Sequence, residues 1–212
     1  MTDHRTRLLE SARRTEALGL NHAATGNLSL RATGGMLITP TAVPYHRLDG
    51  EGLVAMRLDG TVEGTGTPSS EWQLHAAIYR ARADLGAIVH AHSRFATTLA
   101  CLREDLPPVH YMLAITGAAR VRCAPYAPFG SAELAEAAVT ALGPSRACLL
   151  GNHGLVAAGT DLDEALRVAV EVETVAEYWW RARAVGAPVL LSDAEMAEAI
   201  VRFRSYGVPP GR

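Results

Sequence analysis

Apolar residues recur along the chain at two spacings, which predict helices mixed with strands. A spacing of three to four residues predicts helices over residues 8–18, 71–82, 94–101, 131–142 and 161–185, with a final helix that begins after residue 192 and stops at residue 207. Short apolar or alternating runs predict strands over residues 27–30, 36–39, 53–58, 61–63, 86–92, 109–115, 121–123, 147–150 and 155–158. Because strands and helices alternate, we expect one α/β domain over residues 1–212, with a mixed central sheet and helices on both faces.

Turn and capping residues sharpen several of these limits. The Thr33–Gly35 segment predicts a hairpin between the first two strands. Ser70 followed by Gln73, and Ser192 followed by Glu195, have the spacing of a capping box, in which two backbone N–H groups are satisfied reciprocally. We therefore expect a helix to begin directly after each serine.

The basic residues narrow the chemistry that the chain can perform. Lysine and arginine together number 20, and every one of them is an arginine. A chain without lysine cannot form a Schiff base with a carbonyl substrate or with pyridoxal phosphate, and it cannot build a P-loop. Carbanion chemistry would therefore need a different electron sink, and a metal ion is the obvious candidate.

Charge, hydropathy and cysteine content exclude several classes of partner. The formal net charge of −2 argues against binding nucleic acid or anionic lipid through net charge. No apolar run is long enough to cross a membrane. Cys101, Cys123 and Cys148 form no CxxC pair, which indicates a reducing compartment, the cytoplasm.

His90 and His92 are the clearest local signal for a metal site. Residues two apart in a strand point to the same face, so both imidazoles can reach one cation. A lone pair of this kind is more often hydrogen-bonded polar residues at a strand end. His153 changes that balance, because it lies in a glycine-flanked turn from which its side chain can project beyond the sheet. The other histidines show no ligand spacing: His4, His22, His46, His75 and His110.

Glu71 stands at the start of a predicted helix. A carboxylate there commonly does no more than interact with the helix dipole, but it could also be a fourth metal ligand or a general base. Ser69 and Ser70, with the free N–H groups beside them, could hold a phosphate without any lysine, although capping is their ordinary role. The small polar turns around Asn27 and Thr41 could add donors, although such turns are common.

The order and spacing of five short segments resemble one family. These segments are Gly-Asn-Leu-Ser, Leu-Ile-Thr-Pro-Thr, Pro-Ser-Ser-Glu-Trp, Ile-Val-His-Ala-His and Asn-His-Gly. Together, over residues 18–207, they are similar to the class II aldolase/adducin family, and the segments at residues 109–112 and 123–130 favour its aldolase branch. The resemblance implies an α/β domain with a mixed, largely antiparallel sheet.

The resemblance implies a role for each matching residue. The family's ligands for one divalent metal ion per subunit, Zn²⁺ or else Mn²⁺ or another divalent ion, correspond to His90, His92, His153 and Glu71. Its phosphate-binding positions correspond to Asn27, Thr41, Ala42, Ser69 and Ser70. Glu71 would also be the catalytic acid/base, with Tyr111 from a neighbouring subunit and Tyr206 as further catalytic residues.

The implied activity is that of a metal-dependent aldolase. It would reversibly cleave a ketose 1-phosphate, either L-fuculose 1-phosphate or a related deoxy- or methylthio-ribulose 1-phosphate, to dihydroxyacetone phosphate and an aldehyde. The implied assembly is a homotetramer with active sites at subunit interfaces. The chain departs from the family at Ala42, where glycine is usual, and at Asn152, where histidine is frequent.

Other activities within the family use the same histidines. A sugar-phosphate dehydratase, a 4-epimerase and a decarboxylase are the alternatives to the aldolase. A non-catalytic, adducin-like binding module is a further alternative from a different class. The complete set of three histidines and Glu71 argues against it, because a scaffold has no need of a metal site.

Overall fold

The computed structural model describes residues 2–203, and within them eight strands form one sheet. The strands are β1 (Asn27–Ala32), β2 (Gly35–Ile38), β3 (Val54–Arg57), β4 (Val62–Glu63), β5 (Ala87–Ala91), β6 (Arg122–Ala124), β7 (Ala147–Leu150) and β8 (Gly154–Gly159). In space they follow the order β4-β3-β2-β1-β5-β8-β7-β6. Every neighbouring pair is antiparallel except β6 with β7, which confirms the mixed, largely antiparallel sheet.

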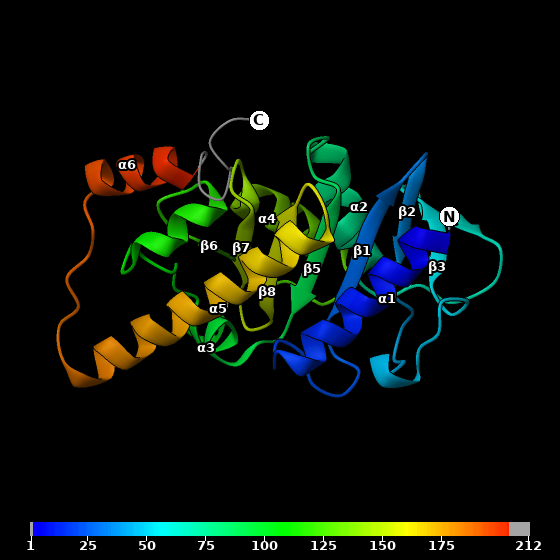
Figure 1. The fold of residues 1–212 in the computed structure, drawn as a ribbon, viewed down its shortest axis with the longest axis horizontal. Coiled ribbons are helices and arrows are strands. Elements are labelled where there is room, and N and C mark those ends of the chain that lie inside the picture. The colour runs from blue at the N-terminus through cyan, green and yellow to red at the C-terminus, as the bar shows by residue number, and fades with distance from the viewer. Residues whose placement is uncertain (1, 204–212) are drawn as a thin grey trace.

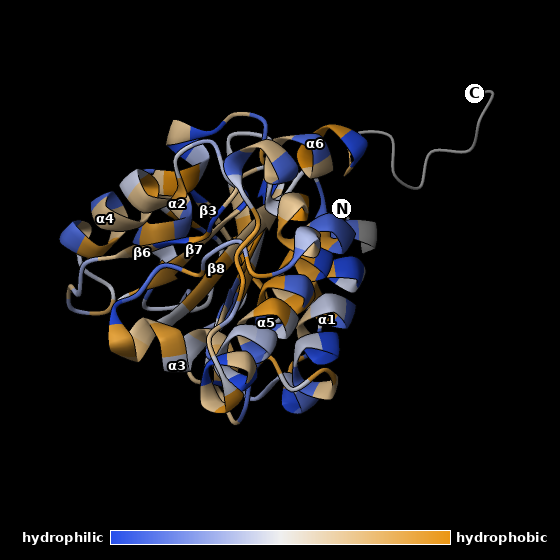
Figure 2. Cartoon of the chain, turned by 90° about the vertical axis from the view of Figure 1, so that its left-hand side faces the viewer, coloured by the Kyte–Doolittle hydropathy of each residue, from blue (hydrophilic) through white to orange (hydrophobic). Residues whose placement is uncertain are grey.

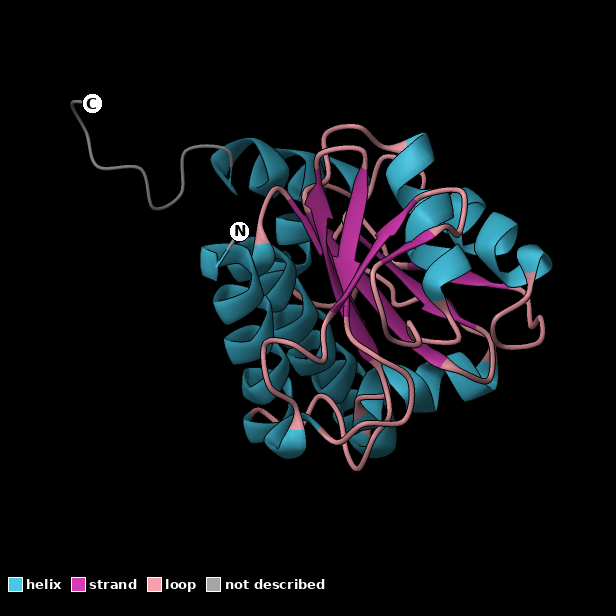
Figure 3. Ribbon diagram, turned by 90° about the vertical axis from the view of Figure 1, so that its right-hand side faces the viewer, coloured by secondary structure: helices cyan, strands magenta, loops and turns pink. Residues whose placement is uncertain are grey.

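Helices cover both faces of this sheet (Figure 1). They are α1 (Thr2–Ala17), α2 (Trp72–Ala81), α3 (Arg94–Leu102), α4 (Ala132–Leu142), α5 (Leu162–Val185) and α6 (Asp193–Phe203), with 3₁₀ segments η1 (Tyr45–Arg47) and η2 (Tyr111–Thr116). Figure 2 shows α2 and α4 on one side of the strands and α1 and α5 on the other. Figure 3 shows the strands between the two helical layers. Among the helices of residues 2–203, none is both long and apolar enough to span a membrane.

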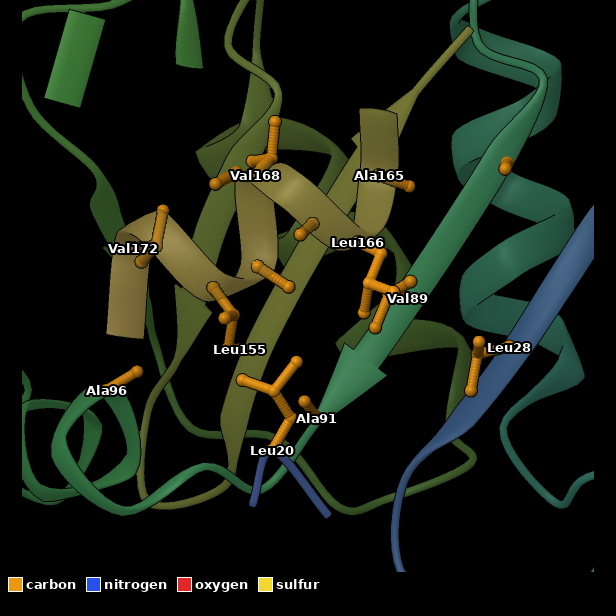
Figure 4. Packing of buried hydrophobic residues seen from close by; sticks show 14 of the residues in the cluster. Leu20, Leu28, Val89, Ala91, Ala96, Leu155, Ala165, Leu166, Val168 and Val172 are labelled. Atoms are coloured by element: carbon orange, nitrogen blue, oxygen red, sulfur yellow. The ribbon is translucent and has the colours of Figure 1, made fainter. Parts of the chain in front are cut away.

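The alternation of side chains along β5 explains the two layers. Val89 and Ala91 point into an apolar core formed with α1, α3 and α5, whereas Ile88 points into a second core under α2 and α4. Figure 4 shows the first of these cores, with Val89 beside Leu166 of α5. Because β5 lies in the middle of the sheet, both of its faces are buried.

Capping residues explain where two of the helices begin. The Ser131 hydroxyl accepts a hydrogen bond from the N–H of Leu134 at the start of α4. The capping box expected at Ser192 is confirmed. The N–H of Ser192 donates to the Glu195 carboxylate at 2.7 Å, and the N–H of Glu195 donates to the Ser192 hydroxyl at 3.3 Å.

The capping box expected at Ser70 is wrong. Helix α2 begins at Trp72, with Glu71 as its N-cap and no side-chain capping bond. The preceding segment is held extended, because the N–H of Ser69 donates to the carbonyl oxygen of Thr39 at 3.0 Å. The Ser70 hydroxyl therefore does not cap helix α2 and is free to bind another group.

The strand expected over residues 109–115 is also wrong, because the segment forms the 3₁₀ helix η2. Four successive residues, Leu113–Thr116, are all buried, whereas a strand with one face in solvent would bury every second residue. The segment packs into the core and does not lie in the sheet. The His110 ring accepts from the N–H of Met112 at 3.3 Å, and Gly117, with φ of 76°, ends the segment. The periodicity of a short apolar run cannot distinguish these two conformations.

Candidate metal centre and phosphate cleft

The ends of three neighbouring strands bring the candidate residues together. Antiparallel pairing places Asn27, the first residue of β1, opposite His90 near the end of β5. His92 follows β5 directly. On the other side of β5, strand β8 begins immediately after His153. One end of the sheet therefore collects side chains that are far apart in the sequence.

Three imidazole rings surround a common point. The ring centroids are 4.9 Å apart for His90 and His92, 4.8 Å for His90 and His153, and 5.0 Å for His92 and His153. The corresponding interplanar angles are 76°, 82° and 78°, so no two rings stack. The Nε2 atoms of His90 and His92 are 3.0 Å apart. Two nitrogen lone pairs at that distance repel each other unless a proton or a cation lies between them.

The Glu71 carboxylate completes this group. Its Oε2 lies 3.1 Å from Nε2 of His90, and its Oε1 lies 3.2 Å from Nε2 of His153. Glu71 is only 6% exposed and His90 is fully buried. The ligand atoms of Glu71 and the three histidines all lie within 4.8 Å of one another. The four residues expected to form the metal site are thus close enough to share one ion.

Hydrogen bonds and burial keep the imidazoles in the form that binds metal. The Nδ1 of His90 donates to the carbonyl oxygen of Leu155 at 2.9 Å, which leaves the Nε2 lone pair directed at the cluster. Burial, together with the neighbouring His90 ring, lowers the pKa of His92 to about 3 and the pKa of His153 to about 4. Both rings are therefore neutral at physiological pH, and neutral imidazole is the ligand form.

The pKa of Glu71 lies well below its ordinary value. Burial alone would raise this pKa, but the proximity of His90 and His153 and a hydrogen bond from Asn27 outweigh burial. An acid/base carboxylate works best when its pKa is near the working pH. In contact with the imidazoles, Glu71 is therefore held as an anion, which suits a ligand more than a proton donor.

The donor set fits a divalent cation. Histidine nitrogens and carboxylate oxygens are common zinc ligands. A tetrahedral ion with Zn–N bonds of about 2.0–2.1 Å separates its nitrogen ligands by roughly 3.3 Å, close to the 3.0 Å between the Nε2 atoms of His90 and His92. Such an ion would also relieve the repulsion between the facing lone pairs. The cluster can therefore hold a divalent metal ion.

A cleft of about 390 Å³ opens beside the cluster. Its lining includes all the residues expected to bind phosphate, namely Asn27, Thr41, Ala42, Ser69 and Ser70. Within residues 2–203, the N–H groups of Ala42 and Ser70 donate to no protein acceptor. The N–H groups of Thr41 and Ser69 are already bonded to backbone carbonyls, so of the two serines Ser70 is the one whose N–H faces no backbone acceptor among the described residues. The cleft still offers uncharged donors of the kind that hold a phosphate without lysine.

Ala42 has a left-handed backbone, with φ of 55°. This conformation costs a residue other than glycine about 1–2 kcal/mol. The backbone thus keeps a conformation that glycine adopts freely, and the alanine reduces stability without redirecting the chain.

Two further residues support the cluster: Asn21, which sequence reasoning did not single out, and Gly154, a glycine of the turn that contains His153. The buried Asn21 accepts a hydrogen bond from the N–H of His92 at 3.1 Å and so fixes the segment after β5. A β-carbon on Gly154 would lie 2.5 Å from the carbonyl oxygen of Ala91 and 3.1 Å from the His92 ring, so only glycine fits there. A polar residue in a short connection between apolar elements, as Asn21 is, could have been recognised as a buried group that needs partners.

The remaining expected residues lie in different places. Tyr111 does not line the cleft; it is 54% exposed, and its ring lies 4.7 Å from that of His110. Tyr206 and the expected helix stop at residue 207 lie outside the described residues. Asn152 does line the cleft, and its side-chain oxygen accepts from Nε of Arg103 at 2.7 Å.

Comparison with known proteins shows the family and the fold of the chain. The model of the class II aldolase and adducin N-terminal domain matches residues 6–180. A 5-methylthioribulose-1-phosphate/5-deoxyribulose-1-phosphate aldolase of Rhodospirillum rubrum is 42% identical over 200 residues, which cover 94% of this chain and 90% of that protein. An L-fuculose phosphate aldolase of Escherichia coli is 42% identical over 192 residues, which cover 90% of this chain and 89% of that protein. A solved structure of an L-fuculose 1-phosphate aldolase has a TM-score of 0.94 at 38% identity, covering 96% of this chain and 97% of that one.

Proposed function

Because the chain belongs to the class II aldolase and adducin family, we propose that it is a metal-dependent aldolase that reversibly cleaves a ketose 1-phosphate. The products would be dihydroxyacetone phosphate and an aldehyde. One observation carries the proposal: a group of three imidazoles and a carboxylate lies beside a cleft whose lining offers uncharged donors for a phosphate. A binding module without catalysis would need only the second of these features.

The proposed cofactor is one divalent ion per subunit, zinc in the first place, held by His90, His92 and His153 with Glu71 as a further ligand. Once bound between neutral histidines, such an ion supplies Lewis-acid stabilisation of the negative charge that develops on the substrate as its C3–C4 bond breaks. The supporting observation is the close spacing of the four ligand groups.

Glu71 is the acid/base at C3 in this proposal. During cleavage its carboxylic acid gives a proton to C3, and during condensation its carboxylate removes that proton. The carboxylate lies within 3.2 Å of the His90 and His153 imidazoles, so it has to turn away from them as the substrate enters. Loss of those contacts raises its pKa toward the range in which it can both take and release a proton.

The phosphate fixes the position of C3 relative to Glu71. Asn27 lines the cleft and also donates to Glu71 at 2.9 Å, so the phosphate donors and the acid/base are directly connected. Holding the substrate by its phosphate converts the proton transfer into a positioned, effectively intramolecular step. Thr41, Ala42, Ser69 and Ser70 complete the proposed phosphate site.

The proposed assembly is a homotetramer in which Tyr111 reaches the cleft of a neighbouring copy. Tyr111 is exposed and does not line its own cleft, which suits a residue that acts across an interface. There it would exchange a proton with the C4 oxygen, and Tyr206 would be a further catalytic residue. We also propose that the protein is cytoplasmic, in keeping with its free cysteines. Residues 1–212 would form a single domain.

The proposed substrates are L-fuculose 1-phosphate and 5-deoxy- or 5-methylthio-ribulose 1-phosphate. All of them end in a small apolar group. Tyr126 and Phe129 line the cleft and are 55% and 73% exposed, so this apolar end would find aromatic surface within reach.

The test is a coupled assay for dihydroxyacetone phosphate, with the zinc-loaded protein and each of these ketose 1-phosphates. We expect dihydroxyacetone phosphate from at least one of them and little from the unphosphorylated ketoses. Loss of water or inversion at C4 without dihydroxyacetone phosphate would instead identify a dehydratase or a 4-epimerase. A decarboxylase would leave these ketose 1-phosphates unchanged and release carbon dioxide only from a sugar phosphate that carries a carboxylate. A protein that binds no metal and turns over nothing would be a binding module.

A further inference from the structure

A row of polar side chains runs from Glu71 into the core between α2 and β1. On the α2 side, Glu71, His75 and Tyr79 are four residues apart, and on β1, Asn27 and Ser29 are two residues apart. Four residues of a helix rise about 6 Å and two residues of a strand rise about 6.8 Å. The polar residues on the helix and those on the strand therefore have nearly the same spacing. Their side chains alternate between helix and strand along the row.

Each side chain in this row is hydrogen-bonded to the next. Nδ2 of Asn27 lies 2.9 Å from Oε2 of Glu71, and Oδ1 of Asn27 lies 2.6 Å from Nε2 of His75. Nδ1 of His75 lies 2.7 Å from Oγ of Ser29, which lies 2.9 Å from the Tyr79 hydroxyl. His75 and Ser29 are fully buried and Tyr79 is 1% exposed. These three residues of the row are therefore shielded from water, whereas its Asn27 and Glu71 end lines the cleft.

Only one direction of donation fits an ionised Glu71. A carboxylate accepts, so the NH₂ group of Asn27 faces Glu71 and its carbonyl oxygen faces His75. His75 then donates from Nε2 and accepts at Nδ1 from the Ser29 hydroxyl, which accepts from Tyr79. Burial lowers the pKa of His75 to about 3, so its neutral ring supplies the one donor and one acceptor that the row requires.

We propose that His75 is a positioning residue for the aldolase reaction: it fixes the Asn27 amide so that the NH₂ group serves both Glu71 and the phosphate end of the cleft. This inference rests on the proposed function. One hydrogen of the NH₂ group goes to Glu71, and the other meets no acceptor within residues 2–203, although Asn27 lines the cleft. Without the Nε2–H donor of His75, the Asn27 side-chain amide could rotate by about 180°. Its carbonyl oxygen would then face the Glu71 carboxylate and the substrate phosphate, which are both negative.

The row orients side chains and does not carry protons to the active site. The Asn27 amide separates Glu71 from His75, and an amide NH₂ group donates without releasing its proton. Burial raises the pKa of Tyr79, so its hydroxyl also keeps its proton. An uncharged donor in place of the imidazole should therefore be sufficient.

The first test compares variants of the zinc-loaded enzyme. His75→Phe keeps an aromatic ring without nitrogens, and His75→Gln keeps an amide donor in place of Nε2. We expect His75→Phe to lower kcat/KM about 10-fold to 100-fold, through a higher KM as well as a lower kcat, the range for a lost hydrogen bond that serves a charged group. His75→Gln should recover most of this loss. The control Ile78→Val, a buried change on the same helix outside the row, should alter neither constant.

A double-mutant cycle shows whether His75 acts through Asn27. In an Asn27→Ala background, His75→Phe should change kcat/KM by less than about twofold, because both changes remove the same contact. Full additivity would overturn the inference. Equal losses for His75→Phe and His75→Gln, in proportion to lost zinc, would also overturn it by showing a purely structural role.

The second test needs no turnover. Nitrogen-15 NMR of histidine-labelled, zinc-loaded protein, with His75→Gln to assign the signal, reports the tautomer of His75. We expect the neutral Nε2–H form. A neutral Nδ1–H form or an imidazolium would reverse the row and overturn the inference even if the aldolase activity is confirmed. A wild-type protein with the expected tautomer that forms no dihydroxyacetone phosphate would instead overturn the proposed function, and with it the role of His75 in that reaction.

Discussion

The two faces of strands β1 and β5 bury different kinds of side chain. On one face, Leu28 and Val89 lie in the aliphatic core that contains α5 (Figure 4). On the other, Asn27, Ser29 and His90 are almost as completely buried but polar. They lie beside the apolar Ile88 of the second core, and we call this side the polar face. An unpaired buried polar group costs about 1–3 kcal/mol, so the polar face is stable only because each of these side chains has a hydrogen-bond partner.

Both faces belong to the same two strands, so packing on the apolar face also positions the side chains of the polar face. Close packing against α5 holds β1 and β5 at fixed positions. The imidazoles and the Asn27 amide are then held in place before a substrate arrives, which is what a preorganised site requires. Substitutions on the polar face should therefore lower the activity, and substitutions on the apolar face should lower the free energy of unfolding.

The largest effect should come from a change at the centre of the polar face. His90→Ala removes an imidazole that contacts Glu71 and lies next to the other two rings. We expect loss of stoichiometric zinc and a fall in kcat/KM of at least about 10²–10³-fold, the cost of one preorganised electrostatic group. Atomic emission and the coupled assay measure the two effects. His46→Ala, at an exposed histidine, is the control, and full zinc content with full activity in His90→Ala would refute the assignment.

The apolar face should respond in the opposite way. Leu166 of α5 is 1% exposed, and its replacement by alanine should lower the free energy of unfolding by about 2–5 kcal/mol. The activity per bound zinc should stay the same at temperatures where the variant is folded. Urea denaturation and the coupled assay test both statements, and an activity loss in the folded variant would show that the two faces are not separable.

The pH dependence of stability reports the cost of the polar face. His75 has a pKa of about 3 when folded, against about 6.5 in an unfolded chain. Below pH 6.5 the unfolded chain binds a proton at His75 that the folded protein does not, so stability falls as pH falls. Between pH 6.5 and 5, the metal-free wild type should lose roughly 1.5–2 kcal/mol more than His75→Gln. Urea denaturation at both pH values gives this difference, and equal losses would contradict it.

The smallest effect should come from the edge of the cleft. Ala42→Gly relieves the left-handed strain at φ of 55°, partly offset by the greater freedom of glycine in the unfolded chain. We expect a net gain of about 0.5–1 kcal/mol in the free energy of unfolding. Ala24→Gly, at a cleft residue whose φ is not positive, should give no gain. A loss of stability in Ala42→Gly would show that its backbone is not strained.

Local patterns in the sequence indicated the histidines of the cluster, the family resemblance completed the set with Glu71, and neither indicated the residues that support it. The spacing of His90 and His92 predicts a shared face whatever the rest of the fold, and the structure places them on it with His153 nearby. His75 has no ligand spacing and was not assigned a role. Its partner Asn27 is 48 residues away, and only the packing of α2 on β1 brings the two together.

Segment 109–115 shows a second limit of sequence patterns. The alternatives for a short apolar run differ by local hydrogen bonds, such as that from the N–H of Met112 to the His110 ring, and by burial on every side, as at Leu113 and Ala114. Periodicity contains neither kind of information. The hairpin of β1 and β2, by contrast, follows from the adjacent Thr33–Gly35 turn and was predicted correctly.

If Glu71 moves the proton at C3, the exchange of that proton in dihydroxyacetone phosphate with solvent deuterium depends on the Glu71 carboxylate. Proton NMR follows the exchange in zinc-loaded protein. We predict that Glu71→Gln keeps its zinc but exchanges about 10²–10⁴-fold more slowly than wild type, the usual contribution of a general acid/base. Tyr111→Phe should exchange normally while losing most carbon–carbon cleavage. Normal exchange by Glu71→Gln together with lost exchange by Tyr111→Phe would reverse the two roles and assign the C3 proton to Tyr111.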